Sequence, residues 1–129
     1  MATILIIDDE SGIRYIAKTI LSQNPGADPL TILEASSGSQ GLELLTQYHP
    51  ELVLLDYRLP DMDGSEWLHQ AQELRPTAVI LVSASSELEH IAHKHSLVVG
   101  TLAKPFKLDK LRITVLDALS RGLPGGVSP

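Results

Sequence analysis

The sequence predicts an α/β fold in which one five-stranded parallel sheet is doubly wound, with helices on both of its faces. Apolar runs of strand length alternate along the chain with segments of helical apolar spacing, five of each. Several of these runs are apolar without interruption, which is typical of parallel strands buried on both faces. Repeated strand–helix units with short connections need right-handed crossovers, and these place helices on both faces of a single sheet.

Strands are expected near residues 3–8, 30–35, 52–56, 78–83 and 99–103. The clearest of them contain uninterrupted apolar runs, which are Ile4 to Ile7, Leu52 to Leu55 and Val79 to Val82. The run from Val98 to Ala103 is weaker but occupies the place in the alternation where a fifth strand is needed.

Helices are expected near residues 12–23, 38–48, 64–75, 87–95 and 107–120. The first and the last show apolar stripes at helical spacing, formed by Ile13, Ile16, Ala17, Ile20 and Leu21 and by Leu108, Leu111, Val115, Ala118 and Leu119. In the third, Trp67, Leu68, Ala71 and Leu74 are expected to face the core. Capping-box spacing marks two helix starts, Ser37 with Gln40 and Ser86 with Glu89.

Composition narrows the classes of function. A formal net charge of −6, with no cluster of Lys and Arg, argues against direct nucleic-acid binding, which depends mainly on cationic contacts to phosphate. The absence of cysteine excludes disulfides, thiolate nucleophiles and thiolate metal sites. No apolar run approaches the roughly 20 residues of a membrane span. We therefore expect a cytoplasmic protein with no membrane insertion.

The chain of 129 residues is expected to form one domain, over residues 1–120. Residues 121–129 are rich in Gly and Pro and contain little to bury. They are predicted to be a flexible tail or the remnant of a linker.

Polar residues follow the predicted strands at the point where each one ends. They are Asp8 and Asp9, Asp56, Ser83 and Lys104. The carboxyl ends of parallel strands line the ligand crevice of such folds, so these side chains are expected to converge on one site. Three carboxylates, a hydroxyl and an ammonium together suit a divalent cation and a phosphoryl group.

The acidic residues point to Mg²⁺. Asp8, Asp9 and Asp56 would repel one another unless a cation lay among them, and Mg²⁺ prefers a small number of carboxylates together with phosphate oxygens. Asp56 also has the chemistry of a nucleophile that accepts a phosphoryl group. Lys104 and Ser83 would then contact the phosphoryl oxygens. Taken singly, these residues also fit plainer roles, because acidic residues suit helix starts and an Asp often lies in a turn.

These motifs resemble the receiver domain of two-component response regulators, of the chemotaxis-regulator type. The resemblance extends from about Thr3 to Leu119. It is carried by Ile-Ile-Asp8-Asp9-Glu10 with Ile13-Arg14, by Leu-Leu-Asp56 with Leu59-Pro60-Asp61-Met62-Asp63-Gly64, by Val82-Ser83-Ala84 and by Lys104-Pro105-Phe106. It implies a flavodoxin-like strand order, 2-1-3-4-5, of which receiver proteins are a known example.

The resemblance also implies a role for each matching residue. Asp56 would be the phosphoacceptor, and Mg²⁺ would be held by Asp9, by Asp56, by Asp8 through water and by the backbone carbonyl of Arg58. Lys104 would contact the phosphoryl group, and Ser83 would move toward it after transfer. The peptide before Pro105 is expected to be cis.

A sensor histidine kinase or a phosphotransfer protein would supply the phosphoryl group, and an output protein of unknown identity would receive the signal. The family usually has Tyr or Phe three residues before the lysine, where this chain has Thr101. Thr101 keeps one alternative open, a receiver that docks without phosphorylation. An alternative of a different class is a small Mg²⁺-dependent phosphatase with Asp56 as its nucleophile. The phosphatase would need a general acid and a cap, but residue 58 is Arg and no insertion supplies a cap.

Overall fold

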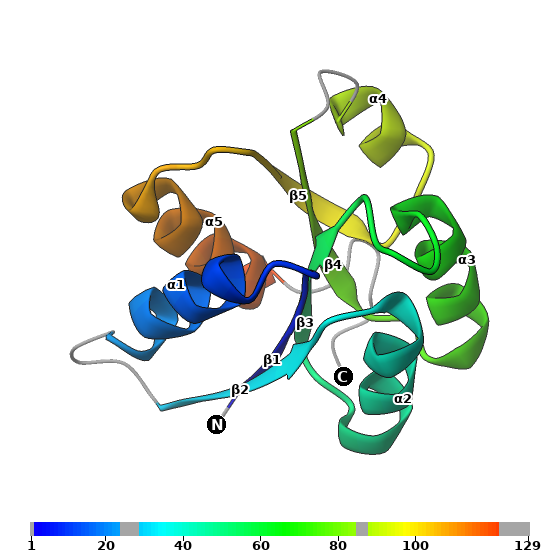
Figure 1. Ribbon diagram of the computed structural model, residues 1–129, viewed down its shortest axis with the longest axis horizontal. Coiled ribbons are helices and arrows are strands. Elements are labelled where there is room, and N and C mark those ends of the chain that lie inside the picture. Colours follow the sequence, from blue (N-terminus) through cyan, green and yellow to red (C-terminus); the bar gives the residue numbers. More distant parts are fainter. Residues whose placement is uncertain (1, 24–28, 85–87, 122–129) are drawn as a thin grey trace.

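The computed structural model describes residues 2–23, 29–84 and 88–121. Strands and helices alternate along this part of the chain as the sequence predicts, and Figure 1 shows them wound around one sheet. The elements are β1 (Ala2–Ile7), α1 (Ser11–Ser22), β2 (Leu30–Ala35), α2 (Gly38–Tyr48), β3 (Leu52–Asp56), α3 (Gly64–Leu74), β4 (Ala78–Ser83), α4 (Leu88–His93), β5 (Val98–Ala103) and α5 (Leu108–Arg121).

The five strands form one parallel sheet in the order β2-β1-β3-β4-β5, which confirms the predicted order. Strand β1 lies between β2 and β3, and Ile4 stands opposite both Ile32 and Leu52. The register of β4 against β5 shifts between Val79 and Ile80. The carboxyl ends of β1, β3 and β4 therefore lie side by side at one edge of the sheet.

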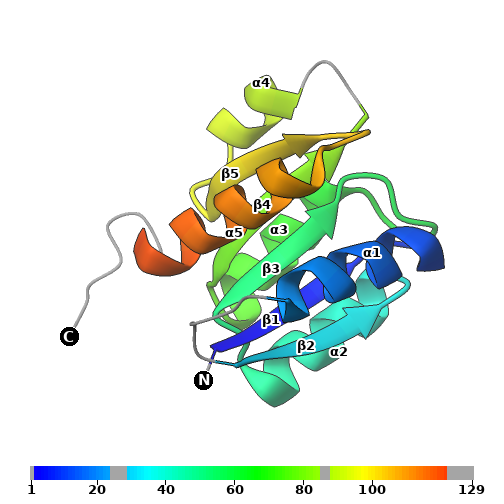
Figure 2. The ribbon, with the colours of Figure 1, turned by 90° about the vertical axis from the view of Figure 1, so that its left-hand side faces the viewer.

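The two faces of the sheet carry separate layers of helices. Helices α1 and α5 cover one face, while α2, α3 and α4 cover the other, as Figures 1 and 2 show. Strand β3 contributes side chains to both layers, because successive side chains of a strand point to opposite faces. Leu52 and Leu54 pack toward α1 and α5, whereas Val53 and Leu55 pack toward the other helices.

Trp67 of α3 is the largest side chain in the second layer and is fully buried. Its indole N–H donates a hydrogen bond of 3.2 Å to the carbonyl of Gly38, so the polar atom of this buried ring has a partner. Leu68 and Ala71 are buried beside it as predicted, but Leu74, at the end of α3, is exposed. Ile16 and Leu108, which belong to the apolar stripes of α1 and α5, are also exposed.

Helix α2 begins with the predicted cap and receives a second one from a distant loop. The Ser37 hydroxyl accepts a hydrogen bond from the N–H of Gln40. The Gln40 side chain in turn accepts one from the N–H of Ser36. The carboxylate of Asp61, from the loop after β3, accepts from Gly38 and Ser39, each at 2.9 Å. Together these contacts satisfy the free N–H groups of the first turn.

Several element boundaries differ from the prediction by one or two residues. Strand β1 ends at Ile7, so Asp8 lies in the loop beyond it, and α4 ends at His93, so His95 lies outside the helix. The expected cap Ser86 and most of the predicted tail, residues 122–129, lie outside the described residues. None of the helices in the described part of the chain combines the length and hydropathy that crossing a membrane needs.

Candidate functional site

The carboxyl-end edge of the sheet brings together three of the predicted site residues. Asp8 follows β1, Asp56 ends β3, and Lys104 follows β5. The ammonium of Lys104 lies 2.8 Å from Asp8 Oδ2 and 3.3 Å from Asp56 Oδ2. One lysine thus bridges the carboxylates of Asp8 and Asp56, which are 48 positions apart along the chain.

This cluster is largely removed from water. The side chains of Asp8 and Asp56 are only 4% and 8% exposed, and that of Lys104 is 15% exposed. Burial of carboxylates without compensation is costly, and the shared ammonium places a positive charge beside both of them.

The charges around Asp56 shift its pKa in a defined direction. Burial, followed by repulsion from Asp8, raises the pKa of the Asp56 carboxyl above its usual 3.8, and the charge and hydrogen bond of Lys104 only partly offset this. For Lys104, burial opposes the charged form, but the hydrogen bond with Asp8 and the charge of Asp56 outweigh it and raise the pKa of the ammonium. The cluster therefore contains a lysine held in its charged form. Beside it lies the Asp56 carboxylate, whose negative charge is disfavoured by burial and by the nearby Asp8.

Ser83 lies at the same edge, at the end of β4, and is buried. Its backbone carbonyl accepts a hydrogen bond of 2.9 Å from the N–H of Lys104. In the neighbouring strand pair, Asp56 stands opposite Val82. Ser83 is thus one residue beyond the position that faces the candidate nucleophile. The peptide between Lys104 and Pro105 is cis, as predicted.

The loop after β1 gathers three acidic side chains, Asp8, Asp9 and Glu10, which we call the acidic loop. One carboxylate oxygen from each lies within 4.8 Å of the other two. Asp8 is buried while the other two are exposed, so the group opens to solvent. Oxygen donors of this kind at the mouth of a buried pair fit Mg²⁺, which combines a few carboxylates with water ligands.

Asp8 makes hydrogen bonds that help to hold the loop. Its Oδ1 accepts a hydrogen bond of 2.9 Å from the N–H of Glu10, and its own N–H donates to the carbonyl of Ala35 at 3.1 Å. Asp8 therefore does not simply start helix α1, whose first turn contains no acidic residue. Its carboxylate serves both the turn and the contact with Lys104.

Arg58, the remaining predicted ligand, lies two residues beyond Asp56 and is exposed. Its N–H points to Asp56 Oδ1 at 3.5 Å, at the limit of a hydrogen bond. Arg58 also pairs with Asp63 in an isolated antiparallel bridge, which ties the loop after β3 back on itself. The backbone of Arg58 is thus beside the site while its side chain extends toward solvent.

Two contacts near the site were not predicted from the sequence. Glu10 Oε1 lies 3.4 Å from the ammonium of Lys104, although this carboxylate is 63% exposed. Arg14 donates a hydrogen bond of 2.6 Å to the backbone carbonyl of Asp8. The sequence signalled that Glu10 and Arg14 belong to the motif after β1, but it contained no signal for their partners.

Around β5, the position three residues before Lys104 is occupied by Thr101. Thr101 is partly buried and stands opposite Leu81 of β4. It lines a surface hollow of about 200 Å³ together with residues of α4 and β5. Leu97, just before β5, is buried in the core and its carbonyl accepts from the N–H of Val79.

Comparisons with known proteins agree with this geometry. The chain matches the response regulator receiver domain family over residues 4–116. It is 35% identical to sporulation initiation phosphotransferase F of Bacillus subtilis, over 94% of this chain and 93% of that protein. It is 33% identical to the KDP operon transcriptional regulatory protein KdpE of Escherichia coli, over 94% of this chain and 52% of that protein.

Solved structures show the same likeness. A CheY-like response regulator receiver domain protein from Methanospirillum hungatei superposes with a TM-score of 0.82 and 28% identity, covering 93% of this chain and 94% of that one. The signal receiver domain of a LuxO repressor protein from Vibrio parahaemolyticus also has a TM-score of 0.82, at 26% identity, covering 93% and 91% of the two chains. Fold, strand order and sequence motifs therefore agree, and the chain belongs to the response regulator receiver domain family.

Proposed function

We propose that this receiver is switched by phosphorylation of Asp56. The observation that carries the proposal is the position of the Lys104 ammonium, 2.8 Å from Asp8 and 3.3 Å from Asp56. A buried carboxylate beside a fixed ammonium and an acidic loop is arranged to receive a group that brings several negative oxygens with it. The donor is a sensor histidine kinase or a phosphotransfer protein, and the output passes through contacts with another protein.

In the transfer, a carboxylate oxygen of Asp56 attacks the phosphorus of a phosphohistidine. A bond forms between this oxygen and phosphorus while the bond from phosphorus to the imidazole nitrogen breaks, and the imidazole takes up a proton. Lys104 neutralises a phosphoryl oxygen, and the Ser83 hydroxyl donates a hydrogen bond to another. Attack of water on phosphorus later releases phosphate and restores the Asp56 carboxylate.

Mg²⁺ would be held by Asp8, Asp9 and Asp56 and by the backbone carbonyl of Arg58, with Glu10 at the rim of the site. When bound, the ion neutralises phosphoryl oxygens. The residues of the chain supply the rest: Asp56 is the nucleophile, Lys104 compensates charge, and Asp8 orients that lysine. The name of the Bacillus relative, sporulation initiation phosphotransferase F, supports phosphoryl transfer as the chemistry.

We further propose that the chain acts in the cytoplasm, where sensor kinases present their phosphohistidines. Residues 1–120 form the receiver in this proposal, and residues 121–129 serve as a tail or linker. Its acidic net charge of −6 makes a protein, rather than nucleic acid, the direct target of the output.

Incubation with acetyl phosphate and Mg²⁺ tests the proposal. We expect one phosphoryl group per chain, detected by intact mass, that is lost in base and absent after chelation. Asp56→Asn abolishes the label. Asp109→Asn, which changes a carboxyl with a 90% exposed side chain on α5, leaves the label unchanged and is the matched control.

Three outcomes would contradict the proposal. A fully labelled Asp56→Asn would place the acceptor elsewhere. A parent protein that takes no label from acetyl phosphate or from any sensor kinase of its host would instead support a receiver that docks without phosphorylation. Continuous hydrolysis of p-nitrophenyl phosphate dependent on Asp56 would point to a phosphatase.

A further inference from the structure

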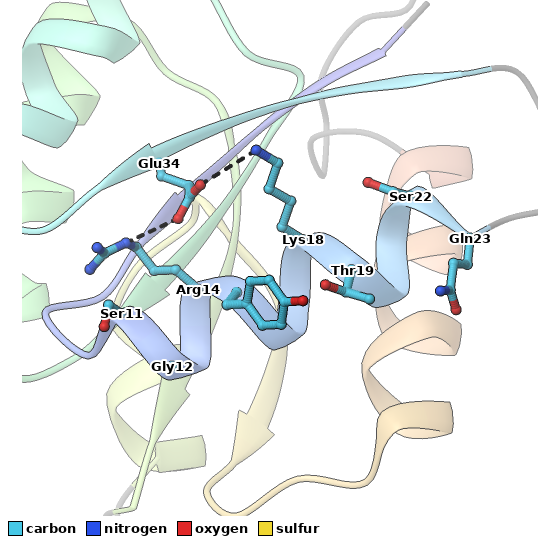
Figure 3. Close-up of a pocket in the computed structure, with 9 residues that line it drawn as sticks. Ser11, Gly12, Arg14, Lys18, Thr19, Ser22, Gln23 and Glu34 are labelled. Carbon is cyan, nitrogen blue, oxygen red and sulfur yellow. Dashed lines mark hydrogen bonds and ion pairs between the residues drawn. The ribbon is translucent and has the colours of Figure 1, made fainter.

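A line of polar contacts connects strand β2 to the acidic loop through a single arginine of α1. Glu34 Oε1 accepts a hydrogen bond of 3.2 Å from Arg14 Nε, as Figure 3 shows. The Nη1 of the same guanidinium donates to the backbone carbonyl of Asp8 at 2.6 Å. We call Glu34, Arg14 and this carbonyl the brace.

The brace acts on a loop that is already held at its two ends. The N–H of Asp8 donates to the carbonyl of Ala35, the residue after Glu34, and the N–H of Arg14 donates to the carbonyl of Glu10. Arg14 therefore contacts the loop twice, through its backbone at Glu10 and through its guanidinium at Asp8. The segment that contains Asp8, Asp9 and Glu10 is enclosed between these contacts.

We propose that Arg14 is a positioning residue for the divalent-cation site, oriented by Glu34 and acting through the backbone of Asp8. This inference rests on the proposed function, in which the acidic loop holds Mg²⁺. Arg14 contacts neither the phosphoryl group nor the ion in this account. Its task is to keep the carboxylates of the acidic loop in one arrangement despite their mutual repulsion.

The chemistry of the arginine side chain suits this task. A guanidinium is planar and presents its donors in a fixed fork, so contacts with Glu34 and Asp8 at the same time define its orientation. The side chain of Arg14 is only 17% exposed and that of Glu34 35% exposed, which limits the rotation of both. Partners of this kind outside the metal ligands typically change metal affinity by about 10–100-fold when removed.

The charge of Arg14 by itself predicts the opposite change in Mg²⁺ affinity, so a binding measurement can test the inference. A guanidinium repels a cation, so loss of Arg14 by itself would strengthen Mg²⁺ binding. If the brace positions the acidic loop, the same substitution weakens binding. The sign of the change in affinity separates the two accounts.

Lys18 supplies a matched control on the same helix. Its ammonium lies 3.7 Å from Glu34 Oε2, so it shares the carboxylate of the brace, and it lies one turn farther along α1 from the loop (Figure 3). Arg14, Lys18 and Glu34 all line a surface hollow of about 730 Å³ beside α1. Substitutions at these positions therefore enlarge a hollow that is open to solvent rather than create a cavity in the core.

The test is a calorimetric titration of the full chain with MgCl₂. We expect Arg14→Ala to raise the Kd for Mg²⁺ about 10-fold or more. Arg14→Lys keeps the charge but cannot contact Glu34 and Asp8 together, so an intermediate loss is expected. Lys18→Ala removes a cation near the same carboxylate and is expected to change the Kd by less than about twofold, as for an exposed ion pair.

Two further measurements complete the test. Hydrogen exchange does not depend on activity, and labelling at varied Mg²⁺ concentration separates metal binding from phosphoryl transfer. In the metal-free protein, amide hydrogen exchange at Asp9 and Glu10 becomes faster in Arg14→Ala and stays unchanged in Lys18→Ala. With acetyl phosphate, the Mg²⁺ concentration for half-maximal labelling rises in Arg14→Ala, while the rate at saturating Mg²⁺ stays close to that of the parent. Loss of the saturated rate alone would be a catalytic effect and would contradict a positioning role.

Equal or tighter Mg²⁺ binding by folded Arg14→Ala would overturn the inference while leaving the proposed function intact. If Arg14→Ala does not fold, the comparison is made with Arg14→Lys, and an unchanged Kd there has the same meaning. A parent chain that binds no Mg²⁺ would overturn both the proposed function and this inference.

Discussion

The ammonium of Lys104 lies 2.8 Å from the carboxylate of Asp8, and this contact joins the ends of the first and last strands of the fold. The same ammonium also reaches Asp56, at 3.3 Å. A single cation thus keeps two buried carboxylates compatible with the folded state. Removal of the ammonium should therefore leave the two carboxylates to repel each other and lower the stability of the folded protein.

We expect Lys104→Met to lower the free energy of unfolding at neutral pH by up to about 3 kcal/mol, because loss of one partner leaves buried charge uncompensated. Added Mg²⁺ should restore part of this loss, since a cation would again lie beside the carboxylates. Urea unfolding with and without MgCl₂ measures both effects. Lys18→Met, which removes an exposed pair, should cost less than about 1 kcal/mol. Equal stability of Lys104→Met and the parent would show that the ammonium does not stabilise the cluster.

Asp61 connects two loops near the site by capping α2 from a distance. Asp61→Ala removes acceptors for Gly38 and Ser39 and should lower the free energy of unfolding by about 1 kcal/mol, the usual effect of losing a helix cap. Glu73→Ala, on the exposed surface of α3, should stay within about 0.5 kcal/mol of the parent.

The effect of Asp61 should depend on pH with a defined sign. Hydrogen bonds from the N–H groups of Ser39 and Gly38 lower the pKa of the Asp61 carboxyl below 3.8. A lowered pKa in the folded state stabilises the protein above the unfolded value, and this stability is lost as the pH falls through the folded value. The difference between Asp61→Ala and the parent should therefore shrink on acidification below pH 3.8. A difference that persists unchanged would mean that the carboxylate charge plays no part.

His95 is predicted to make the α4–β5 connection sensitive to acid. Its Nε2 lies 3.2 Å from Ser65 Oγ, and its ring meets that of His69 edge to face with centroids 6.2 Å apart. Burial, then the charge of His69, lower the pKa of His95, with a small further contribution from Lys94, while Asp63 opposes the shift. Stability from neutral His95 is full above pH 6.5 and is lost as the pH falls through the folded pKa.

Urea unfolding from about pH 7.5 down to about pH 5 measures this dependence. We expect His95→Gln to flatten the decline in stability. His69→Gln should make the decline smaller, because removing the repulsion from His69 brings the folded pKa of His95 closer to its unfolded value. The exposed His93 supplies the control, and His93→Gln should leave the curve unchanged. A parent curve identical to that of His95→Gln would contradict the prediction.

Gly41 allows α2 to approach β1 just below the acidic loop. A Cβ on Gly41 would overlap Ile7 Cδ1 and lie 3.2 Å from Trp67 Nε1, and both residues are fully buried. Gly41→Ala should therefore cost about 1–3 kcal/mol through overpacking. At Gly12, in α1, nothing lies within 4 Å of an added Cβ, so Gly12→Ala should stabilise by about 0.5–1 kcal/mol. Thermal unfolding of the two variants measures the contrast, and destabilisation of equal size in both would exclude close packing at Gly41 as its cause.

The sequence by itself determined the α/β class, because the evidence for it is local. Runs such as Val79 to Val82 report burial on both faces, and Ser37 with Gln40 marks a helix start within four residues. The convergence of Asp8, Asp56 and Lys104 followed from the same pattern, since each comes at the end of a parallel strand and such ends meet at one edge. The order of the strands came from the resemblance to a family rather than from periodicity.

Only the tertiary structure decided which side chains meet across elements. Asp61 reaches Gly38 from 23 positions away, and Arg14 joins Glu34 to the acidic loop. His95, predicted to lie on a helix, lies beyond α4 and meets His69. These contacts depend on loop geometry and on the distance between packed elements. Neither quantity can be predicted from the apolar periodicity of the sequence. For the same reason the sequence indicated a cation and phosphoryl site but not the brace that holds its acidic loop.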